Sequence, residues 1–375
     1  MATTKKDNSI YNVALSLVPK LGPNLYKNII RYCGSAESFF SLNNGKAAKI
    51  PGIGPKLLAY RKDKDRYLRD AELLIEAAIK NHIQIHCYVD STYPQRLKSV
   101  PDSPTVIFTK GKIDLNPVRS LGIVGTRNAT LYGKNITQKI VEELAPFAPT
   151  IISGLAYGID IEAHRAALSH LLPTIGILGS DLNTIYPAAH RNTAFQMMEN
   201  GGLLTEYKLN TALNPSNFPQ RNRIIAAMSD ALIVVEAAEK GGALITAEIA
   251  YSYNREVFAV PGNLQSKYSE GCNNLIRYMK AGIYMGAREI IEALSWGNEG
   301  HSKNPTIPLP DLSQLDPGEK KIMEILIEKI EIEIDRLSWE MEMPISELAV
   351  KLLNLEFLGL VKSLPGKKYV QAHKK

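Results

Sequence analysis

The stretch Ser120-Leu-Gly-Ile-Val-Gly-Thr-Arg-Asn decides the fold: a short apolar run ends in a glycine turn, and a stretch of helical length begins near Tyr132. A similar order recurs along the chain, and the apolar runs are continuous rather than alternating, so both faces of the predicted sheet must be covered. This pattern predicts an α/β fold with a Rossmann-like, doubly wound, mainly parallel sheet. Further strands are predicted at Thr150-Ile-Ile-Ser-Gly, Thr174-Ile-Gly-Ile-Leu-Gly, Ala231-Leu-Ile-Val-Val-Glu and Glu256-Val-Phe-Ala-Val-Pro-Gly, and helices at residues 134–145, 160–171, 188–199, 242–253 and 272–280.

Other blocks flank this core. Residues 1–82 read as short helices broken by glycine turns, a helix-hairpin-helix or SAM-like domain, and residues 83–296 hold the Rossmann-like domain. Residues 297–316 contain several prolines and few apolar residues, which predicts a linker. Residues 317–375 read as three helices and a hairpin around Pro365-Gly, which is the outline of a winged helix.

The composition is ordinary for a soluble globular protein, with 45% hydrophobic and 22% charged residues. No run approaches the ~18 apolar residues of a membrane span, and the first residues lack the apolar core of a signal peptide. The three cysteines, Cys33, Cys87 and Cys272, are far apart and odd in number, which argues against a disulfide frame or a zinc site. We therefore expect a cytoplasmic protein without a metal.

The formal net charge of +6 is uneven along the chain. Residues 1–86 hold 14 Lys and Arg against 7 Asp and Glu, residues 87–310 hold 20 against 19, and residues 311–375 hold 10 against 12. The excess therefore belongs to the N-terminal segment. A basic segment suggests an anionic partner such as nucleic acid, although a solvated charged face would look the same.

Two glycine turns punctuate the N-terminal block, Val18-Pro-Lys-Leu-Gly-Pro and Ile50-Pro-Gly-Ile-Gly-Pro. The second is close to a helix-hairpin-helix signature, in which a tight turn lets backbone N–H groups face a phosphate. Basic residues follow it, which suits that partner. The alternative is a turn used for packing or for protein contact, and the sequence leaves both open.

The turn after residue 124 argues against a dinucleotide cofactor. Two residues separate the glycines of Gly122-Ile-Val-Gly, so the Gly-x-Gly-x-x-Gly pattern is broken, and Ser153-Gly stands where an acid would end the next strand. A phosphate-binding turn, Gly125-Thr, remains, with Arg127 at its tip. A guanidinium bonds two phosphate oxygens at once. The alternative is that Arg127 pairs with an internal carboxylate.

Asp160 and His164 are four residues apart and would share one face of a helix. They could form a catalytic or metal pair, or a carboxylate at the helix start beside a hydrogen-bonded histidine. No array of further metal ligands accompanies them, so we favour the second interpretation. The sequence also lacks a Gly-x-x-x-x-Gly-Lys-Ser/Thr loop and a Gly-x-Ser-x-Gly elbow. We therefore predict a protein that is not an enzyme and has no cofactor.

The segment Phe218-Pro-Gln-Arg-Asn-Arg is placed in a loop that enters a helix. Cations near a helix start oppose the macrodipole, and such a local violation suggests a function. An aromatic ring beside arginines is typical of single-strand binding; the alternative is that Phe218 caps the core and one arginine is structural. Lys240-Gly-Gly and the loops near Gly262 and Asn273 add further turns at strand ends. The candidate DNA-binding residues are Gly125, Thr126, Arg127, Ser153, Gly154, Phe218, Arg221, Asn222, Arg223, Lys240, Gly241, Gly242, Gly262 and Asn273.

These motifs together resemble the DNA-processing protein A (DprA/Smf) family over about residues 90–285. The resemblance implies a Rossmann-like core that binds single-stranded DNA, protects incoming DNA during natural transformation and loads the RecA recombinase. It also implies a homodimer formed through the core. The motifs that carry it, in order, are Tyr93-Pro-Gln-Arg-Leu, Asp102-Ser-Pro-Thr-Val-Ile-Phe-Thr-Lys-Gly, Val124-Gly-Thr-Arg, Ser153-Gly-Leu-Ala-Tyr-Gly-Ile-Asp with Ala163-His, Ile185-Tyr-Pro, Thr205-Glu-Tyr, Phe218-Pro-Gln-Arg-Asn-Arg, Val235-Glu-Ala, Val260-Pro-Gly and Gly271-Cys-Asn-Asn-Leu-Ile.

The main alternative is an enzyme of a related fold. Nucleotide phosphoribohydrolases carry Pro-Gly-Gly-x-Gly-Thr-x-x-Glu, and this chain has Gly241-Gly-Ala-Leu-Ile-Thr-Ala-Glu. Leu244 replaces a glycine and Lys240 a proline, so a phosphate could not lie as close to this turn. The acidic C-terminal block disfavours contact with phosphates, and there we expect a winged helix that binds protein or caps a domain.

Overall fold

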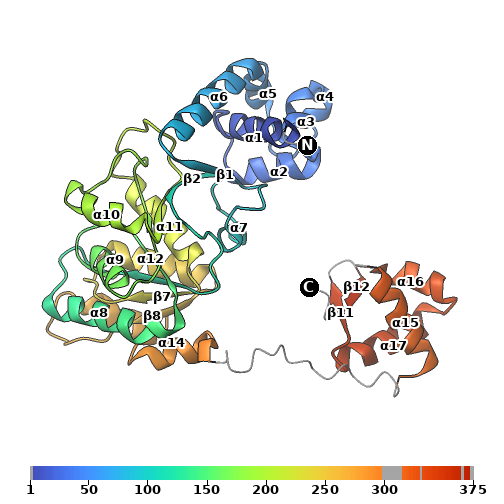
Figure 1. Cartoon of the computed structure of the whole chain (residues 1–375). Coiled ribbons are helices and arrows are strands. Elements are labelled where there is room, and N and C mark those ends of the chain that lie inside the picture. Colours follow the sequence, from blue (N-terminus) through green and yellow to red (C-terminus); the bar gives the residue numbers. More distant parts are fainter. Residues whose placement is uncertain (1–2, 298–314, 330–331, 365–366, 372–375) are drawn as a thin grey trace. The chain divides into compact units, whose positions relative to one another are not determined.

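The computed structural model describes residues 3–297, 315–329, 332–364 and 367–371 (Figure 1). The chain divides into two compact units, residues 1–296 and 297–375. Most of the predicted linker lies outside the described residues. Within the described part, no helix has the length and apolar character needed to span a membrane.

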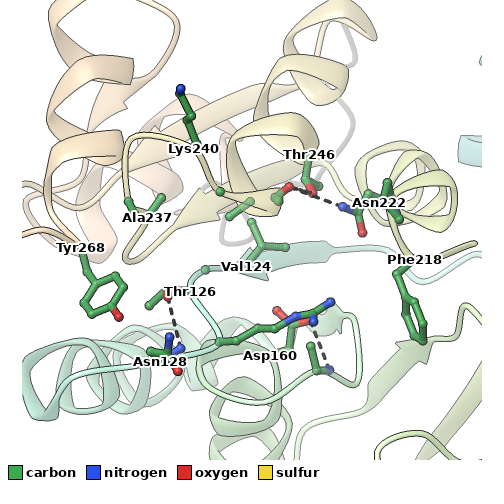
Figure 2. A pocket seen from close by; sticks show the side chains of 18 of the residues that line it. Val124, Thr126, Asn128, Asp160, Phe218, Asn222, Ala237, Lys240, Thr246 and Tyr268 are labelled. Carbon is green, nitrogen blue, oxygen red and sulfur yellow. Dashed lines mark hydrogen bonds between the residues drawn. The ribbon is translucent and has the colours of Figure 1, made fainter. Parts of the chain in front are cut away.

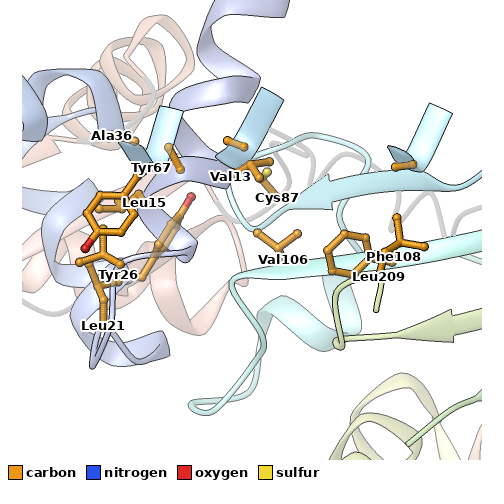
Figure 3. Packing of buried hydrophobic residues seen from close by; sticks show 14 of the residues in the cluster. Val13, Leu15, Leu21, Tyr26, Ala36, Tyr67, Cys87, Val106, Phe108 and Leu209 are labelled. Carbon is orange, nitrogen blue, oxygen red and sulfur yellow. The ribbon is translucent and has the colours of Figure 1, made fainter. Parts of the chain in front are cut away.

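Helices open the first unit, and their core continues into the sheet. Tyr26 is fully buried among them, and the same hydrophobic cluster includes Val106 and Phe108 on the sheet and Leu209 beyond it (Figure 3). This cluster includes residues on both sides of residue 82. The domain boundary predicted there therefore stays a prediction. The helices are α1 (Thr3–Ser16), α2 (Pro23–Cys33), α3 (Ala36–Ser41), α4 (Asn44–Ala47), α5 (Pro55–Arg61) and α6 (Lys64–Lys80).

A nine-stranded sheet forms the centre of this unit, in the order β1-β2-β6-β5-β4-β3-β7-β8-β9. The strands from β6 to β9 in that order are parallel, and β1 and β2 are added antiparallel at one edge. The expected mainly parallel sheet is confirmed. The strands are β1 (Gln84–Cys87), β2 (Val106–Gly111), β3 (Ser120–Val124), β4 (Thr150–Ser153), β5 (Thr174–Ile177), β6 (Gly201–Thr205), β7 (Ala231–Val234), β8 (Glu256–Ala259) and β9 (Gly282–Ile283).

Helices cover both faces of the sheet, as a doubly wound fold requires. One hydrophobic cluster joins the strands to α11 (Asn217–Met228), α12 (Gly242–Ser252) and α13 (Glu270–Arg277) through residues such as Ile224 and Ala247. A second cluster joins the opposite face to α8 (Leu131–Leu144), α9 (Ile159–Ser169) and α14 (Ala287–Ala293) through residues such as Ile140 and Ala163. The remaining helices of this unit are the short α7 (Gln95–Lys98) and α10 (Arg191–Met197), with single 3₁₀ turns at Ala145–Phe147 and Ala188–His190.

The segment Tyr93-Pro-Gln-Arg-Leu ties the antiparallel edge to the parallel core. The Arg96 guanidinium donates to both carboxylate oxygens of Asp230, at 2.6 and 2.8 Å. The buried Tyr93 hydroxyl donates to the Pro104 carbonyl oxygen at 2.6 Å. A bidentate pair fixes orientation as well as distance, so this motif has a structural role in the lead-in to β3.

The second unit is a winged helix, as predicted. Three helices pack around a core that includes Leu337, Leu348 and Leu352. The two strands predicted to flank Pro365 pair antiparallel, although the Pro365-Gly turn itself lies outside the described residues, and a short third strand gives the order β10-β12-β11. The elements are α15 (Pro317–Glu328), β10 (Ile332–Glu333), α16 (Ile334–Met341), α17 (Ile345–Phe357), β11 (Val361–Leu364) and β12 (Lys368–Gln371).

Candidate nucleic-acid interface

A crevice opens at the carboxyl ends of β3 and β7, where the strand order reverses: β4, β5 and β6 lie on one side and β8 and β9 on the other. Such a switch point is where open α/β sheets bind ligands. The pocket there has a volume of about 400 Å³. Figure 2 shows Phe218 and Tyr268 on opposite sides of it. Nine of the predicted site residues line it: Gly125, Thr126, Arg127, Phe218, Arg221, Asn222, Lys240, Gly241 and Gly242.

The loop after β3 is held close to the start of α9. The Thr126 backbone N–H donates to the Glu236 carbonyl oxygen at 2.7 Å, and the Thr126 carbonyl accepts from Ile159 at 3.2 Å. Gly158 has φ +80°, and a Cβ there would lie 2.1 Å from the Thr126 carbonyl oxygen, so only glycine fits this approach. The loop therefore presents Arg127 on a fixed backbone.

The Arg127 side chain is exposed, and it makes no hydrogen bond or ion pair with a described residue. The alternative of an internal carboxylate partner is met only in part: the Arg127 charge helps to oppose the rise in the pKa of the buried Asp160, but the two side chains form no ion pair. Two acidic side chains near the crevice already have partners within the protein. Glu236 is 2% exposed and accepts from the Thr130 N–H at 2.9 Å and the Thr130 hydroxyl at 2.5 Å, which holds Thr130 in place as the N-cap of α8.

The second acid, Asp160, is buried beside Arg221, which is only 5% exposed. The Arg221 Nη2 and Asp160 Oδ2 atoms are 3.6 Å apart, and Arg221 Nη1 also donates to the Ile177 carbonyl. Burial raises the pKa of Asp160, and the neighbouring guanidinium opposes that rise. A Cβ at Gly154 would lie 2.0 Å from Arg221, so glycine is needed for this packing. The pair forms the floor of the crevice.

His164 is completely buried and has a partner at each ring nitrogen. Nδ1 lies 2.7 Å from the Thr174 hydroxyl, and Nε2 lies 2.6 Å from the Gly154 carbonyl oxygen. A carbonyl only accepts, so Nε2 carries the proton. Burial lowers the pKa of His164 to about 4. Among the described residues, no group of three or more His, Cys, Asp or Glu side chains could hold a metal ion. The hydrogen-bonded histidine and the carboxylate in the first turn of α9 match the second interpretation of Asp160 and His164.

This histidine should make the fold sensitive to acid. Between the ordinary pKa near 6.5 and about 4, the unfolded chain takes up a proton that folded His164 does not accept. Stability is therefore lost as the pH falls through this window, by about 2–3 kcal/mol at pH 4.5. Asp160, with a raised pKa, has the opposite sign. Urea unfolding of the His164→Gln variant should lack this part of the pH dependence, whereas exposed His170→Gln should keep it. Equal pH profiles for the two variants would contradict this assignment.

Phe218 lies at the mouth of the crevice, half-buried. Its ring centroid is 5.4 Å from that of Tyr186, which is 47% exposed. A Cβ at Gly179 would lie 2.9 Å from the Phe218 ring, so glycine there lets the ring settle against the sheet. The nearby Asn222 amide donates to the Gly242 carbonyl oxygen at 3.4 Å. An aromatic face therefore borders the cationic loop.

The opposite rim carries two lysines, Lys240 and Lys267, both exposed and without an ion pair to any described acid. Lys267 Nζ lies 5.9 Å from the centre of the Tyr268 ring. Lys267 and Tyr268 were not among the residues predicted from the sequence. Their signal was an adjacent cation and aromatic ring in a loop after a strand, the same mixture that indicated Phe218 and its arginines.

Five predicted residues do not line the crevice. The Ser153 hydroxyl donates to the Ile123 carbonyl oxygen at 2.6 Å, and Gly154 packs against the Arg221 guanidinium. Arg223 pairs with Glu206 instead. Gly262 and Asn273 bond to each other, with N–H to Oδ1 at 3.1 Å and Nδ2 to O at 3.0 Å. Contact of these residues with DNA stays a prediction, and the proposal below does not rest on it.

The predicted secondary structure around Phe218 was wrong. This residue was expected in a loop, but it lies in α11, which begins at Asn217. Arg221 and Arg223 therefore lie in the second turn of a helix, where one faces Asp160 and the other Glu206. These internal carboxylates explain how cations are tolerated near a helix start.

Fold and crevice together define an open α/β protein with a cationic, aromatic-rimmed pocket at the switch point of its sheet. The family model described as DNA recombination-mediator protein A matches residues 84–295, and the DprA winged helix domain matches residues 306–367. The chain belongs to the DNA recombination-mediator protein A family, which confirms the resemblance found in the sequence.

Relatives and solved structures agree with this assignment. Protein Smf of Synechocystis is 32% identical over 96% of this chain and 98% of its own length. DNA processing protein A of Streptococcus pneumoniae is structurally similar, with a TM-score of 0.64 and 30% identity over 76% of this chain and 96% of that one. The Helicobacter pylori protein, whose structure was described for its single-stranded DNA binding mode, gives a TM-score of 0.51 and 29% identity over 57% and 97%.

Proposed function

We propose that this protein binds single-stranded DNA in the crevice, with Arg127, Lys240 and Lys267 on phosphates and Phe218 and Tyr268 against bases. One observation carries the proposal: unpaired cations and partly exposed aromatic rings border the same pocket at the strand ends. Base stacking on aromatic side chains requires unstacked bases, which favours a single strand. The described binding mode of the H. pylori relative supports the same conclusion.

The crevice is proposed to do no chemistry. Among the described residues, the one acid that lines it, Asp160, faces Arg221, and the nearby Glu236 accepts hydrogen bonds from Thr130. A general base must reach a substrate proton, and neither carboxylate is free to do so. The phosphoribohydrolase alternative also needs a glycine where Leu244 stands, next to the buried Ala243.

The wider role is a recombination mediator in the cytoplasm that protects incoming single strands during natural transformation and loads the RecA recombinase on them. The family description and the similarity to DNA processing protein DprA of Bacillus subtilis, 41% identical over 54% of this chain, support this role. Three separate free cysteines suit a reducing compartment.

RecA ATP hydrolysis on strands precoated with single-strand-binding protein should rise when this protein is added.

Two assays separate the binding proposal from the enzymatic alternative. The wild-type chain is titrated into labelled oligo-dT and, separately, incubated with purine and pyrimidine nucleoside monophosphates. The expected result is a retarded oligo-dT complex without release of free base. Base release without oligo-dT binding would overturn the proposal in favour of the nucleotide hydrolase.

Self-association is proposed through the free edge of the sheet at β9. This strand is only two residues long, and apolar side chains around it are exposed, among them Tyr278 at 61%, Met279 at 86% and Met285 at 70%. An exposed sheet edge with an apolar rim is a ready surface for pairing with a second chain. A homodimer would cover it.

Ile283→Glu combined with Met285→Glu should convert the dimer to a monomer, because the pairing would bury two charges without partners. Light scattering after size exclusion measures the mass directly. Val118→Glu, at a side chain that is 85% exposed elsewhere, serves as the control and should remain dimeric. A dimer that persists in the double variant would place the interface on another surface.

A further inference from the structure

Positive charge is concentrated on the N-terminal helices that precede α6. Residues 10–62 contain eight Lys and Arg side chains and one acidic residue, Glu37, whereas α6 holds four basic and four acidic residues. Protein surfaces usually mix both signs, and a field of one sign attracts an oppositely charged partner. The excess is therefore a feature of one short segment.

Two of these eight cations have hydrogen-bond partners among the described residues. Lys27 donates to the carbonyl oxygens of Val100 and Pro101, at 3.2 and 2.7 Å, and Arg61 donates to that of Phe39 at 3.0 Å. The other six are exposed, and none forms an ion pair with a described residue: Lys20, Arg31, Lys46, Lys49, Lys56 and Lys62.

The two glycine turns of this segment lie side by side. A Cβ added at Gly52, in the second turn, would lie 3.2 Å from Leu25, just after the first turn. Gly52 has φ +89°, which a side chain would strain. A Cβ at Gly22 or Gly54 would meet no atom within 4 Å, so the backbone of both turns is open to close approach. Lys20 precedes the first turn, and Lys49 and Lys56 flank the second.

We propose that this paired-turn surface is a second DNA-binding site, which holds the phosphodiester backbone through Lys20, Lys49 and Lys56 without reading sequence. Lysines act as point charges toward phosphates, and two adjacent turns could contact successive phosphates of one strand. Residues 38–62 contain no acidic side chain that would repel a polyanion, and the acids nearest in sequence are Glu37 and Asp63. It is distinct from the crevice at the strand ends and does not depend on it.

The test uses the full chain with the crevice disabled by Arg127→Ala and Lys240→Ala. Into this background we introduce Lys49→Ala with Lys56→Ala, or, as the control with the same charge change, Lys320→Ala with Lys321→Ala in the winged helix. Fluorescence anisotropy with labelled oligo-dT and with a mixed-sequence duplex is measured over a series of salt concentrations. The crevice-disabled protein should retain binding to at least one of the two. Losing Lys49 and Lys56 should flatten the plot of log affinity against log salt by about 1.4 on oligo-dT, about 0.7 for each lysine, and by about 1.8 on the duplex.

The outcomes separate this proposal from the proposed function. Equal salt slopes for the two lysine pairs, or no residual binding in the crevice-disabled background, would overturn the second site while leaving the crevice intact. Unchanged affinity on Arg127→Ala, with binding that depends on Lys49 and Lys56, would instead reject the crevice and keep this site. Sedimentation with phosphatidylserine vesicles but no binding to either oligonucleotide would assign the surface to a membrane and overturn the proposal.

Discussion

Arg127→Ala is expected to weaken binding of oligo-dT about 10–100-fold at low salt. A hydrogen-bonded contact with a charged group contributes roughly 1.5–3 kcal/mol, which corresponds to that change in affinity. The guanidinium forms no hydrogen bond or ion pair with a described residue, so most of the loss in binding free energy should come from the contact with the ligand. Anisotropy titrations with oligo-dT and with a mixed-sequence strand should show the same fold change, because phosphate contacts carry little sequence information.

Salt dependence supplies the control. Losing one phosphate contact on a single strand should reduce the slope of log affinity against log salt by about 0.7. Lys320→Ala removes one exposed positive charge from the winged helix and should leave both affinity and slope unchanged. A loss confined to one base sequence, or an unchanged affinity, would reject Arg127 as a backbone contact.

Arg221→Met is expected to destabilise the first unit by about 3–5 kcal/mol. The substitution leaves the buried Asp160 carboxylate without its guanidinium, and breaking one side of a buried pair has this cost. Because each unit contains one tryptophan, Trp296 or Trp339, a Trp339→Phe background lets fluorescence follow the first unit alone during urea unfolding.

The double variant Arg221→Met with Asp160→Asn tests whether the unpaired Asp160 carboxylate causes this loss of stability. Removing the charge on both sides should restore much of the lost stability, since no unpaired ion remains. The Arg221→Met variant could instead keep the wild-type free energy of unfolding and bind oligo-dT as poorly as Arg127→Ala. That result would show that Arg221 contacts the ligand rather than supports the crevice.

Much of the architecture was predictable because it depends on local pattern. Continuous apolar runs before glycine turns specified a covered parallel sheet, and the glycines marked the strand ends that form the crevice. Arg127 could be chosen because the turn that carries it follows a predicted strand. The start of α11 was misplaced, since Pro215 and Pro219 obscured a helix that begins at Asn217.

The sequence could not show which arginines of α11 bind a ligand and which pair within the protein, because their partners are distant along the chain. Arg221 faces Asp160 and Arg223 faces Glu206. Gly262 and Asn273 likewise bond to each other across a loop, which spacing alone does not reveal. Lys267 and Tyr268 enter the crevice only because the loop after β8 folds back beside the loop after β7.

The doubly wound sheet, the winged helix, the family and the cationic turn at Arg127 could all be predicted without a structure, because each depends on residues close together along the chain. Which cations remain available to a ligand depends on the folded chain. Arg127 and Lys240 form no ion pair within the described part of the chain, whereas Arg221 and Arg223 are paired with carboxylates about 60 and 17 positions away. A charge is available to a ligand only when the fold has not already paired it, and pairing is a property of the packed chain.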